Sequence, residues 1–307
     1  MRDMNKLALS FDLEDWHQMV GAHLGVRDWD KPNRAFERQM RRLFDFLEAS
    51  NANATFFMLG LTAKNYPELV QEAVRRGDEI ACHGYAHECV FTQSENEFRE
   101  DLKRAIDVLG EAAGVSPKGY RAPLFSINRD TPWALDVLAD LGFEYDSSLN
   151  DTPKVPHRLQ GIPKQPTQLR LESGRTLWEL PPSTFDVRKF ALPIGGGSYW
   201  RVLPSPFLIS ALRHNTARGL STALYFHPYE LDSEPLVAPL PPQPSSKQLL
   251  RGGWLTARYR VGQHKVLARL QDAAKAFGFM RYRDALEQVR SAAGARTRTL
   301  SRAGVIV

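Results

Sequence analysis

The chain has 307 residues, of which 43% are hydrophobic and 24% are charged, and its formal net charge is +5 at pH 7. This composition is that of an ordinary globular protein, and the length suits one large domain or two small ones. No stretch approaches the roughly 20 apolar residues that a membrane span needs. The first residues lead into a strand-like run without a secretory signal, and Cys82 and Cys89 show no recognisable pair spacing. We therefore expect a protein of the reducing cytoplasm.

The first strand-like run covers Lys6–Phe11 and ends in three carboxylates, Asp12, Glu14 and Asp15. Clustered carboxylates repel one another and are costly to remove from water. A bound cation would relieve that repulsion, and carboxylates with nearby histidines are common metal ligands. Acids that simply face water at the end of a strand are an equally simple interpretation of this segment alone.

A second strand-like run, 79–82, leads directly into His83 and His87. A spacing of four residues predicts that both imidazoles lie on one side of a helical turn, close enough to bind one ion. A single histidine is more often a core residue with satisfied hydrogen bonds, whereas a pair at the end of a strand is a more specific signal. Two polar strand ends in one chain therefore predict a shared metal site.

Up to residue 146 the chain alternates strand-like and helix-like segments with short connections. The helix-like segments are 34–49, 67–76, 94–113 and 131–141, and the strand-like segments after the first are 54–59, 79–82, 118–121 and 143–146. Such alternation predicts a parallel sheet or barrel with helices outside it. The chemistry of these folds gathers at the carboxyl ends of the strands, which is where the polar motifs fall.

The alternation becomes irregular in the second half of the chain. We expect a long loop over about 151–174, a strand near 178–182, a helix near 206–213, a strand over 222–226, a proline-rich loop over 235–244 and a helix over 261–277. The expected domain organisation is one catalytic barrel over residues 1–288, followed by a basic, frayed tail over residues 289–307.

Positive charge is concentrated in the last quarter of the chain. Six basic residues and no acid lie between Glu234 and Asp272, and four arginines follow Glu287. One interpretation is a surface that faces an anion, such as a nucleotide-sugar diphosphate, a lipid-linked phosphate or a membrane leaflet. A solvated basic face followed by a disordered tail is an equally simple interpretation.

Four motifs in this order resemble those of the polysaccharide deacetylase family, the metal-dependent carbohydrate esterases that share the nodulation-type deacetylase domain. They are Ser10–Asp15, His83–His87, Tyr120–Pro123 and Leu224–Pro228. The resemblance covers about residues 5–285, including a second strand at 54–60, and it implies an α/β fold: a single-domain, distorted (β/α)7-type barrel. The segments Phe11–Trp16 and Gly195–Arg201 resemble signatures of a subgroup found in bacterial exopolysaccharide and surface-glycan gene clusters.

The resemblance implies a metal site and a catalytic base. His83 and His87 would bind one divalent metal ion, with zinc favoured and cobalt, nickel, manganese or iron compatible. Asp12 would be the general base, and either Glu14 or Asp15 would supply the carboxylate ligand. Asp15 keeps the strand parity of the family's adjacent-aspartate pattern, while Glu14 fits a spaced pattern found in some members, so both alternatives stay open.

The remaining roles also come from the resemblance. Arg121 would pair with Asp12, and the backbone N–H of Leu124, after Pro123, would stabilise the oxyanion of the tetrahedral intermediate. His227 would be the general acid, and Asp146 is the candidate to orient it, although the family's motif around that position is blurred here. Apart from the resemblance, Trp200 is a candidate to contact substrate, because its ring, like those of Trp16, Trp29, Tyr199 and Phe226, offers a face on which a sugar could stack; packing in the core or a loop is the more common role of such side chains.

The resulting functional hypothesis is metal-dependent removal of an N-acetyl or N-formyl group from an amino sugar during bacterial surface-polysaccharide synthesis. The expected partner is an N-acetylated sugar or glycan, free or linked to a nucleotide or lipid; nucleic acid is not expected, and the basic C-terminal region could contact a membrane peripherally. Two alternatives remain. One is a non-sugar amide or ureide hydrolase of the same fold, and the other is a glycan-binding protein that has lost activity.

Overall fold

The structure, a computed structural model, describes residues 6–26, 31, 33–152, 157–188, 190–232, 234–292 and 296–307. The strands are β1 (Leu7–Leu13), β2 (Thr55–Met58), β3 (Glu79–Cys82), β4 (Gly119–Tyr120), β5 (Tyr145–Asp146), β6 (Thr167–Arg170), β7 (Thr176–Glu179), β8 (Phe185–Val187), β9 (Phe190–Leu192), β10 (Leu224–Phe226), β11 (Phe279–Met280) and β12 (Thr297–Thr299). The helices are α1 (Trp16–His23), α2 (Arg34–Ala49), α3 (Gly60–Asn65), α4 (Pro67–Arg76), α5 (Glu95–Ala113), α6 (Trp133–Asp140), α7 (Gly197–Trp200), α8 (Ser205–Ala217), α9 (Ser246–Arg260), α10 (Val266–Ala276) and α11 (Tyr282–Ser291).

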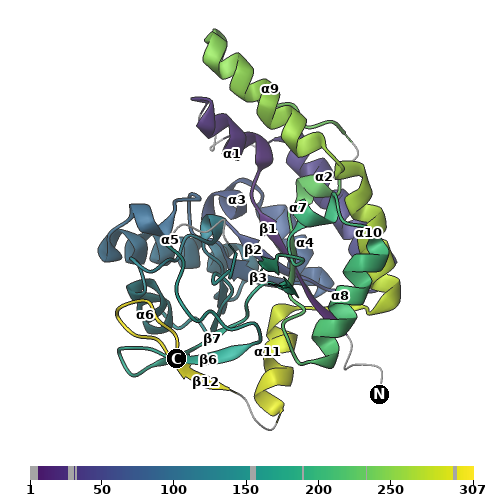
Figure 1. The fold of residues 1–307 in the computed structure, drawn as a ribbon. Coiled ribbons are helices and arrows are strands. Elements are labelled where there is room, and N and C mark those ends of the chain that lie inside the picture. Colours follow the sequence, from purple (N-terminus) through teal and green to yellow (C-terminus); the bar gives the residue numbers. More distant parts are fainter. Residues whose placement is uncertain are drawn as a thin grey trace.

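Ten of these strands form one sheet with the order β10-β1-β2-β3-β4-β5-β7-β6-β12, in which β11 also pairs with the start of β1, while β8 and β9 form a separate two-stranded antiparallel sheet. Every pairing in the large sheet is parallel except that of β6 with β7. The chain just after β7 returns to the start of β10, where Pro182 and Ala223 form a parallel bridge. This bridge closes β10, β1, β2, β3, β4, β5 and β7 into a ring, so the distorted (β/α)7-type barrel expected from the sequence is confirmed (Figure 1).

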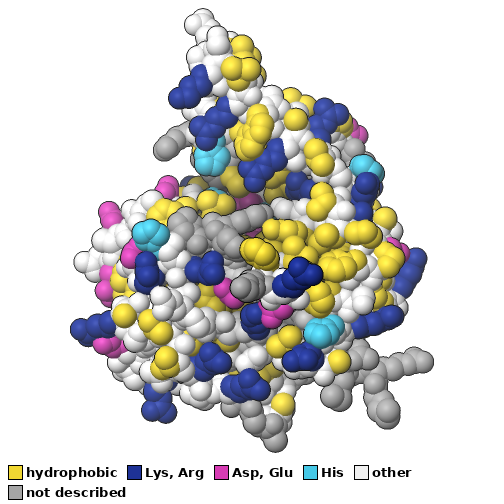
Figure 2. All heavy atoms as spheres, viewed as in Figure 1, with side chains coloured by type: hydrophobic (Ala, Val, Ile, Leu, Met, Phe, Trp, Pro, Cys, Tyr) yellow, Lys and Arg dark blue, Asp and Glu magenta, His cyan; other side chains and the backbone are white. Residues whose placement is uncertain are grey.

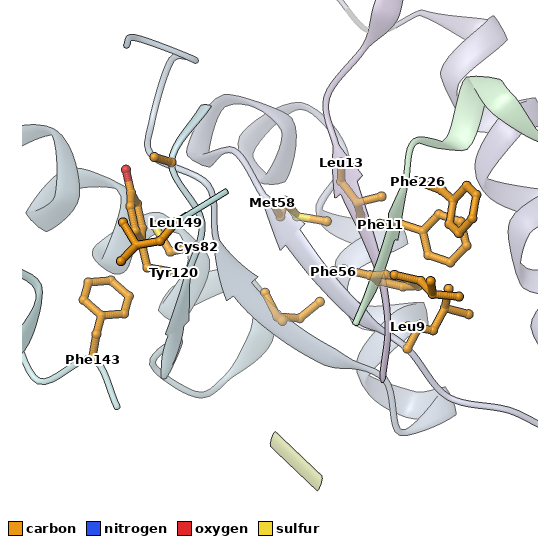
Figure 3. Close-up of a cluster of buried hydrophobic side chains, with 14 of the residues drawn as sticks. Leu9, Phe11, Leu13, Phe56, Met58, Cys82, Tyr120, Phe143, Leu149 and Phe226 are labelled. Atoms are coloured by element: carbon orange, nitrogen blue, oxygen red, sulfur yellow. The ribbon is translucent and has the colours of Figure 1, made fainter. Parts of the chain in front are cut away.

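Successive side chains of β1 face alternately the core beneath the surrounding helices and the inside of the barrel. The odd-numbered positions Leu9, Phe11 and Leu13 belong to the large core cluster shared with the surrounding helices, and Figure 3 shows them beside Phe56 of β2 and Phe226 of β10. The even-numbered positions point the other way, because successive side chains of a strand face opposite sides of the sheet. That alternation directs Ser10 and Asp12 into the barrel, although both are polar and buried.

Local sequence signals account for several helix ends. Ser94 and Glu97 form a reciprocal capping box at the start of α5, which ends at Gly114 in the left-handed conformation. Pro67 begins α4, and Gly77, with φ of 85°, ends it. The sequence predicted both of these helices.

Other elements differ from the sequence prediction. Helix α1 follows β1 in a stretch where no helix was expected, and α9 occupies most of another stretch assigned to no element. The first part of the helix expected over 261–277 is instead a short 3-10 turn, Gln263–Lys265, and α10 begins after it at Val266. Strand β6 lies within the expected loop of 151–174 because it pairs with β7 as a hairpin.

The basic tail also differs from expectation. A frayed tail is expected over residues 289–307, but within its described part β12 pairs with β6, and the side chains of Leu300 and Ile306 are buried. These long-range contacts have no local sequence signature. The division of the chain at residue 288 remains a prediction. Among the described residues, none of the helices combines the length and the apolar character needed to cross a membrane.

Candidate active site

The polar motifs meet at one rim of the barrel. Glu14, His83, Arg121 and His227 each follow the carboxyl end of a different strand, namely β1, β3, β4 and β10. These four strands are parallel, so their carboxyl ends lie on the same side of the sheet. Segments that are far apart in the sequence therefore reach one pocket of about 460 Å³, which Asp12, Glu14, His83, His87 and His227 help to line.

Glu14, rather than Asp15, lies with the two histidines. One side-chain oxygen of Glu14 and one ring nitrogen each of His83 and His87 all lie within 4.8 Å of one another. Asp15 instead caps α1, where its Oδ1 accepts a hydrogen bond of 2.8 Å from the backbone N–H of His17. Among the described residues, the group of possible metal ligands therefore contains Glu14 and leaves out Asp15.

The two histidines are held by a loop and not by the helical turn that their spacing suggested. Gly84 and His87 both have positive φ angles, 82° and 61°, which a right-handed helix does not allow. The backbone N–H of Tyr85 donates to the Asp101 carboxylate over 2.9 Å and fixes this loop. Nδ1 of His83 lies 2.7 Å from the carbonyl oxygen of Arg121, so Nδ1 carries the proton and Nε2 keeps its lone pair for the pocket.

The carboxylate of Glu14 has the environment of a metal ligand. Its Oε2 atom is buried and makes no well-formed hydrogen bond, although Nε2 of His87 lies 2.5 Å away and Nε2 of His83 lies 3.9 Å away. Burial alone would raise the pKa of Glu14, but the charges and hydrogen bonds of His87 and His227 hold it well below its usual value. An ionised oxygen facing two imidazole nitrogens is the donor set that a divalent transition metal prefers, so these residues fit a metal ion.

Asp12 is fixed by a completely buried arginine. Nη1 of Arg121 donates to Asp12 over 2.5 Å and to the hydroxyl of Ser10 over 2.9 Å. The other N–H groups of the guanidinium donate hydrogen bonds to the carbonyl and hydroxyl oxygens of Ser147 and to the hydroxyl of Tyr282. All five N–H groups of Arg121 thus have acceptors, which a buried guanidinium needs. Burial would lower the pKa of Arg121, but the charge of Asp12 raises it above its usual value.

His227 is paired with two carboxylates. Its Nε2 lies 3.2 Å from Oε1 of Glu14, and its Nδ1 lies 3.3 Å from Oε2 of Glu230. Burial alone would lower the pKa of His227, but its hydrogen bonds to Glu14 and Glu230 raise it to about 10. Glu230 is itself buried and accepts a 2.7 Å hydrogen bond from Arg201. The ring of His227 is therefore oriented by Glu230.

The expectation that Asp146 orients His227 is wrong. Asp146 ends β5, where its carboxylate accepts hydrogen bonds from the hydroxyl and the backbone N–H of Ser148. Its ionisable neighbour is Glu179 at the end of β7, which pairs with β5 in register. Burial raises the pKa of both carboxyls, and the pKa of Glu179 lies well above its usual value. Because β7 is the neighbour of β5 in the sheet and β10 is not, Asp146 lies beside Glu179 and not beside His227.

Leu124, but not Trp200, borders the pocket. Leu124 and Phe125 both have left-handed φ angles, 54° and 55°, in a turn that begins at Pro123. Bulky residues adopt this conformation rarely, and such strain is concentrated at functional sites. Trp200 is buried, donates its indole N–H to the carbonyl of Ile194 over 2.7 Å and does not line the pocket.

The other aromatic candidates divide in the same way. Trp16 and Phe226 are fully buried, Tyr199 lines the pocket, and Trp29 lies outside the described residues.

The sequence did not predict that Glu230 and Arg201 belong to the site. Glu230 follows His227 by three residues, and Arg201 ends the glycine-containing segment 195–201, so both stood beside recognised motifs. Their pairing across 29 residues had no local signal.

Two family models match consecutive parts of the chain. Residues 29–145 match the model described as polysaccharide deacetylase, and residues 147–287 match a domain of unknown function, DUF3473. A peptidoglycan-N-acetylglucosamine deacetylase of Bacillus cereus is 31% identical over 96 residues, 31% of this chain and 35% of that protein. A peptidoglycan deacetylase of Helicobacter pylori is 25% identical over 154 residues, 49% of this chain and 52% of that protein. The chain thus spans about half or less of the length of these relatives.

Two solved structures share the fold. A candidate polysaccharide deacetylase from Mycobacterium smegmatis superposes with a TM-score of 0.56 at 23% identity, covering 94% of this chain and 91% of that chain. Puue allantoinase superposes with a TM-score of 0.57 at 18% identity, covering 95% of this chain and 92% of that chain. The part of the chain that matches the polysaccharide deacetylase model, residues 29–145, carries His83, His87 and Arg121, which lie at one rim of the barrel.

Proposed function

We propose that this protein is a metal-dependent deacetylase that removes an N-acetyl or N-formyl group from an amino sugar. The observation that carries the proposal is the convergence of Glu14, His83 and His87 in one pocket with Asp12 and His227. A group of metal ligands, a carboxyl group fixed by a buried arginine as base and a histidine as acid are the parts that hydrolysis of an amide requires.

Glu14, His83 and His87 would hold one divalent ion, with zinc favoured by the two imidazoles and single carboxylate. When bound, such an ion supplies Lewis acidity toward an amide carbonyl and toward water. The hydrogen bond from Nδ1 of His83 to the carbonyl of Arg121 presents Nε2 of His83 to the ion.

Asp12 would accept the proton from the attacking water. Its contact with Arg121 holds the carboxylate in one orientation at the edge of the pocket. The backbone N–H of Leu124, in the strained turn beside the pocket, would donate to the developing oxyanion. His227 would donate a proton to the departing amine as the C–N bond breaks, which yields a free amine and a carboxylate.

The proposed substrate is an N-acetylated glycan of the bacterial surface. The named relatives are peptidoglycan deacetylases, which supports an amino-sugar substrate. The segments Phe11–Trp16 and Gly195–Arg201, which resemble signatures of the surface-glycan subgroup, support a role in surface-polysaccharide synthesis. Arg201 of the second segment holds Glu230, which bonds His227, so this segment also supports the proposed acid.

The experiment is metal analysis of the purified protein together with acetate and formate release from N-acetylated and N-formylated glycan oligomers. We expect His83→Ala to lose both metal and turnover, and Asp12→Asn to keep the metal and lose turnover. His264→Ala, at an exposed histidine outside the pocket, is the matched control and should behave as wild type. Bound metal with turnover of a ureide and not of glycans would favour a ureide hydrolase, whereas glycan binding without metal would favour an inactive binding protein.

A further inference from the structure

Helix α9 projects from the barrel beside α1 (Figure 1). Its buried residues, Gly252 and Leu255, lie on one face of the helix. Leu255 belongs to a cluster of buried residues that includes Trp16 and Leu24 of the α1 region. The side-chain amide of Gln248 donates to the carbonyl of Leu24 over 2.7 Å, and Gly252 lies against Leu240. These contacts fix α9 in place through its inner face.

The opposite face of α9 carries an apolar stripe that the described residues leave uncovered. Leu250 is 77% exposed and Trp254 is 56% exposed, and Ala257 is also exposed. The spacing of four and three residues places them on one side of the helix. Leu249, 50% exposed, flanks this stripe. Large apolar side chains gathered on a projecting element indicate a contact surface.

Positive charges border the stripe. Lys247, Arg251 and Arg258 repeat at helical spacing along one flank, and α9 contains no acidic residue. Within the part of the chain that the structure describes, none of the salt bridges involves these three cations. The guanidinium of Arg258 lies 5.1 Å from the ring centroid of Trp254, so cation and indole occupy the same patch. Figure 2 shows hydrophobic and basic side chains together on this projecting arm.

We infer that the outer face of α9 docks on an anionic lipid surface. A helix with leucine and tryptophan on its exposed stripe and lysine or arginine beside it lies in the interface plane, with its apolar side among the acyl chains. These cations, which form no salt bridge with the described residues, would meet anionic head groups and strengthen the contact. This inference does not depend on the proposed deacetylase activity.

A lipid surface suits this face better than a second protein does. The stripe is one helix wide and stands on a convex projection, whereas a stable protein interface needs about 800 Å² from each partner. The cations lie along one flank without intervening acids, which matches a surface of uniform negative charge rather than the mixed charges of most proteins.

Docking would also place the pocket next to the membrane. Arg258 and Tyr259, at the last turn of α9, line the same pocket as His227. A docked α9 would therefore hold the opening of the pocket close to the head groups, where a lipid-linked glycan would be presented.

The experiment is co-sedimentation of the full chain with vesicles of phosphatidylcholine alone and of three parts phosphatidylcholine with one part phosphatidylglycerol. We expect binding to the anionic vesicles only, and weaker binding as salt increases. The double variants Leu250→Ser/Trp254→Ser and Lys247→Glu/Arg251→Glu should each weaken the binding by about tenfold or more. Val115→Ser, which replaces a 63% exposed apolar residue elsewhere, is the matched control and should bind as wild type.

Three results would overturn the inference. The first is equal binding to both vesicle types or to neither, and the second is undiminished binding by both α9 double variants. The third is a dimer in light scattering that Leu250→Ser/Trp254→Ser converts to a monomer, because the stripe would then be a subunit interface. Circular dichroism of each variant checks that the fold is retained, and it separates lost docking from unfolding.

Discussion

Nδ1 of His83 lies 2.7 Å from the carbonyl oxygen of Arg121, while the guanidinium of Arg121 holds Asp12. One residue at the end of β4 therefore orients a candidate metal ligand through its backbone and the candidate base through its side chain. The two functions are separable, because a substitution at this position removes the guanidinium and keeps the carbonyl.

Arg121→Lys should separate them. Lysine keeps the charge but offers three donors where Arg121 uses five, so buried acceptors lose their partners. We expect the free energy of unfolding to fall by about 3 kcal/mol, with turnover lost and metal content kept. Urea unfolding and metal analysis measure these quantities. Arg213→Lys, at an exposed position of α8, is the control, and an unchanged unfolding free energy for Arg121→Lys would contradict the buried network.

Glu230→Gln should change the pH dependence of turnover. The carboxylate of Glu230 helps to raise the pKa of His227 to about 10, and glutamine removes that charge. The pKa of His227 then falls, so the protonated acid is lost at a lower pH and the alkaline limb of kcat moves toward lower pH. A pH profile measures the shift; the same alkaline limb in wild type and Glu230→Gln would show that Glu230 does not act through His227.

Gly197→Ala should disturb the same pair sterically. A Cβ at residue 197 would lie 2.0 Å from Oε2 of Glu230, whose side chain is buried and held by Arg201. We expect lower turnover and a lower Tm. Gly253→Ala is the matched control, because its Cβ would meet open space and alanine favours a helix interior by about 1 kcal/mol. A Gly197→Ala protein with wild-type Tm and turnover would contradict the close packing around Glu230.

Glu179→Gln should alter how stability depends on pH. Burial and the neighbouring Asp146 raise the folded-state pKa of Glu179 well above 4.5. The folded protein thus binds this proton more tightly than the unfolded chain, so the stabilisation present below pH 4.5 is lost as pH rises through the folded-state pKa. Glutamine does not titrate, and the Tm of the variant should decline less over that range. Parallel Tm profiles for the two proteins would exclude a raised pKa for Glu179.

Much of the first half of the fold follows from local patterns. Helix α4 begins at its proline and ends at Gly77, and β3 covers the four residues that the sequence predicts. The convergence of His83 and His227 follows from parallel strand ends, which share one rim. These predictions succeed because each depends on residues close together in the sequence.

The rest depends on contacts that a single sequence does not display. Helix α9 packs through Leu255 on the α1 region, more than 200 residues earlier, and β12 forms only because β6 offers a free edge. The family resemblance made Asp146 the candidate partner of His227, whereas the strand order places Asp146 beside Glu179. The loop of His87 needs a positive φ that the spacing of two histidines does not predict.

The central claim is that Glu14, with His83 and His87, holds the metal, and the most direct test is the metal content of two neighbouring variants. Glu14→Gln removes the buried carboxylate that faces both histidines, whereas Asp15→Asn keeps a side chain that caps α1 equally well. We predict that elemental analysis finds one divalent ion per chain in the wild type and in Asp15→Asn, and none in Glu14→Gln. Metal retained by Glu14→Gln and lost from Asp15→Asn would contradict this account.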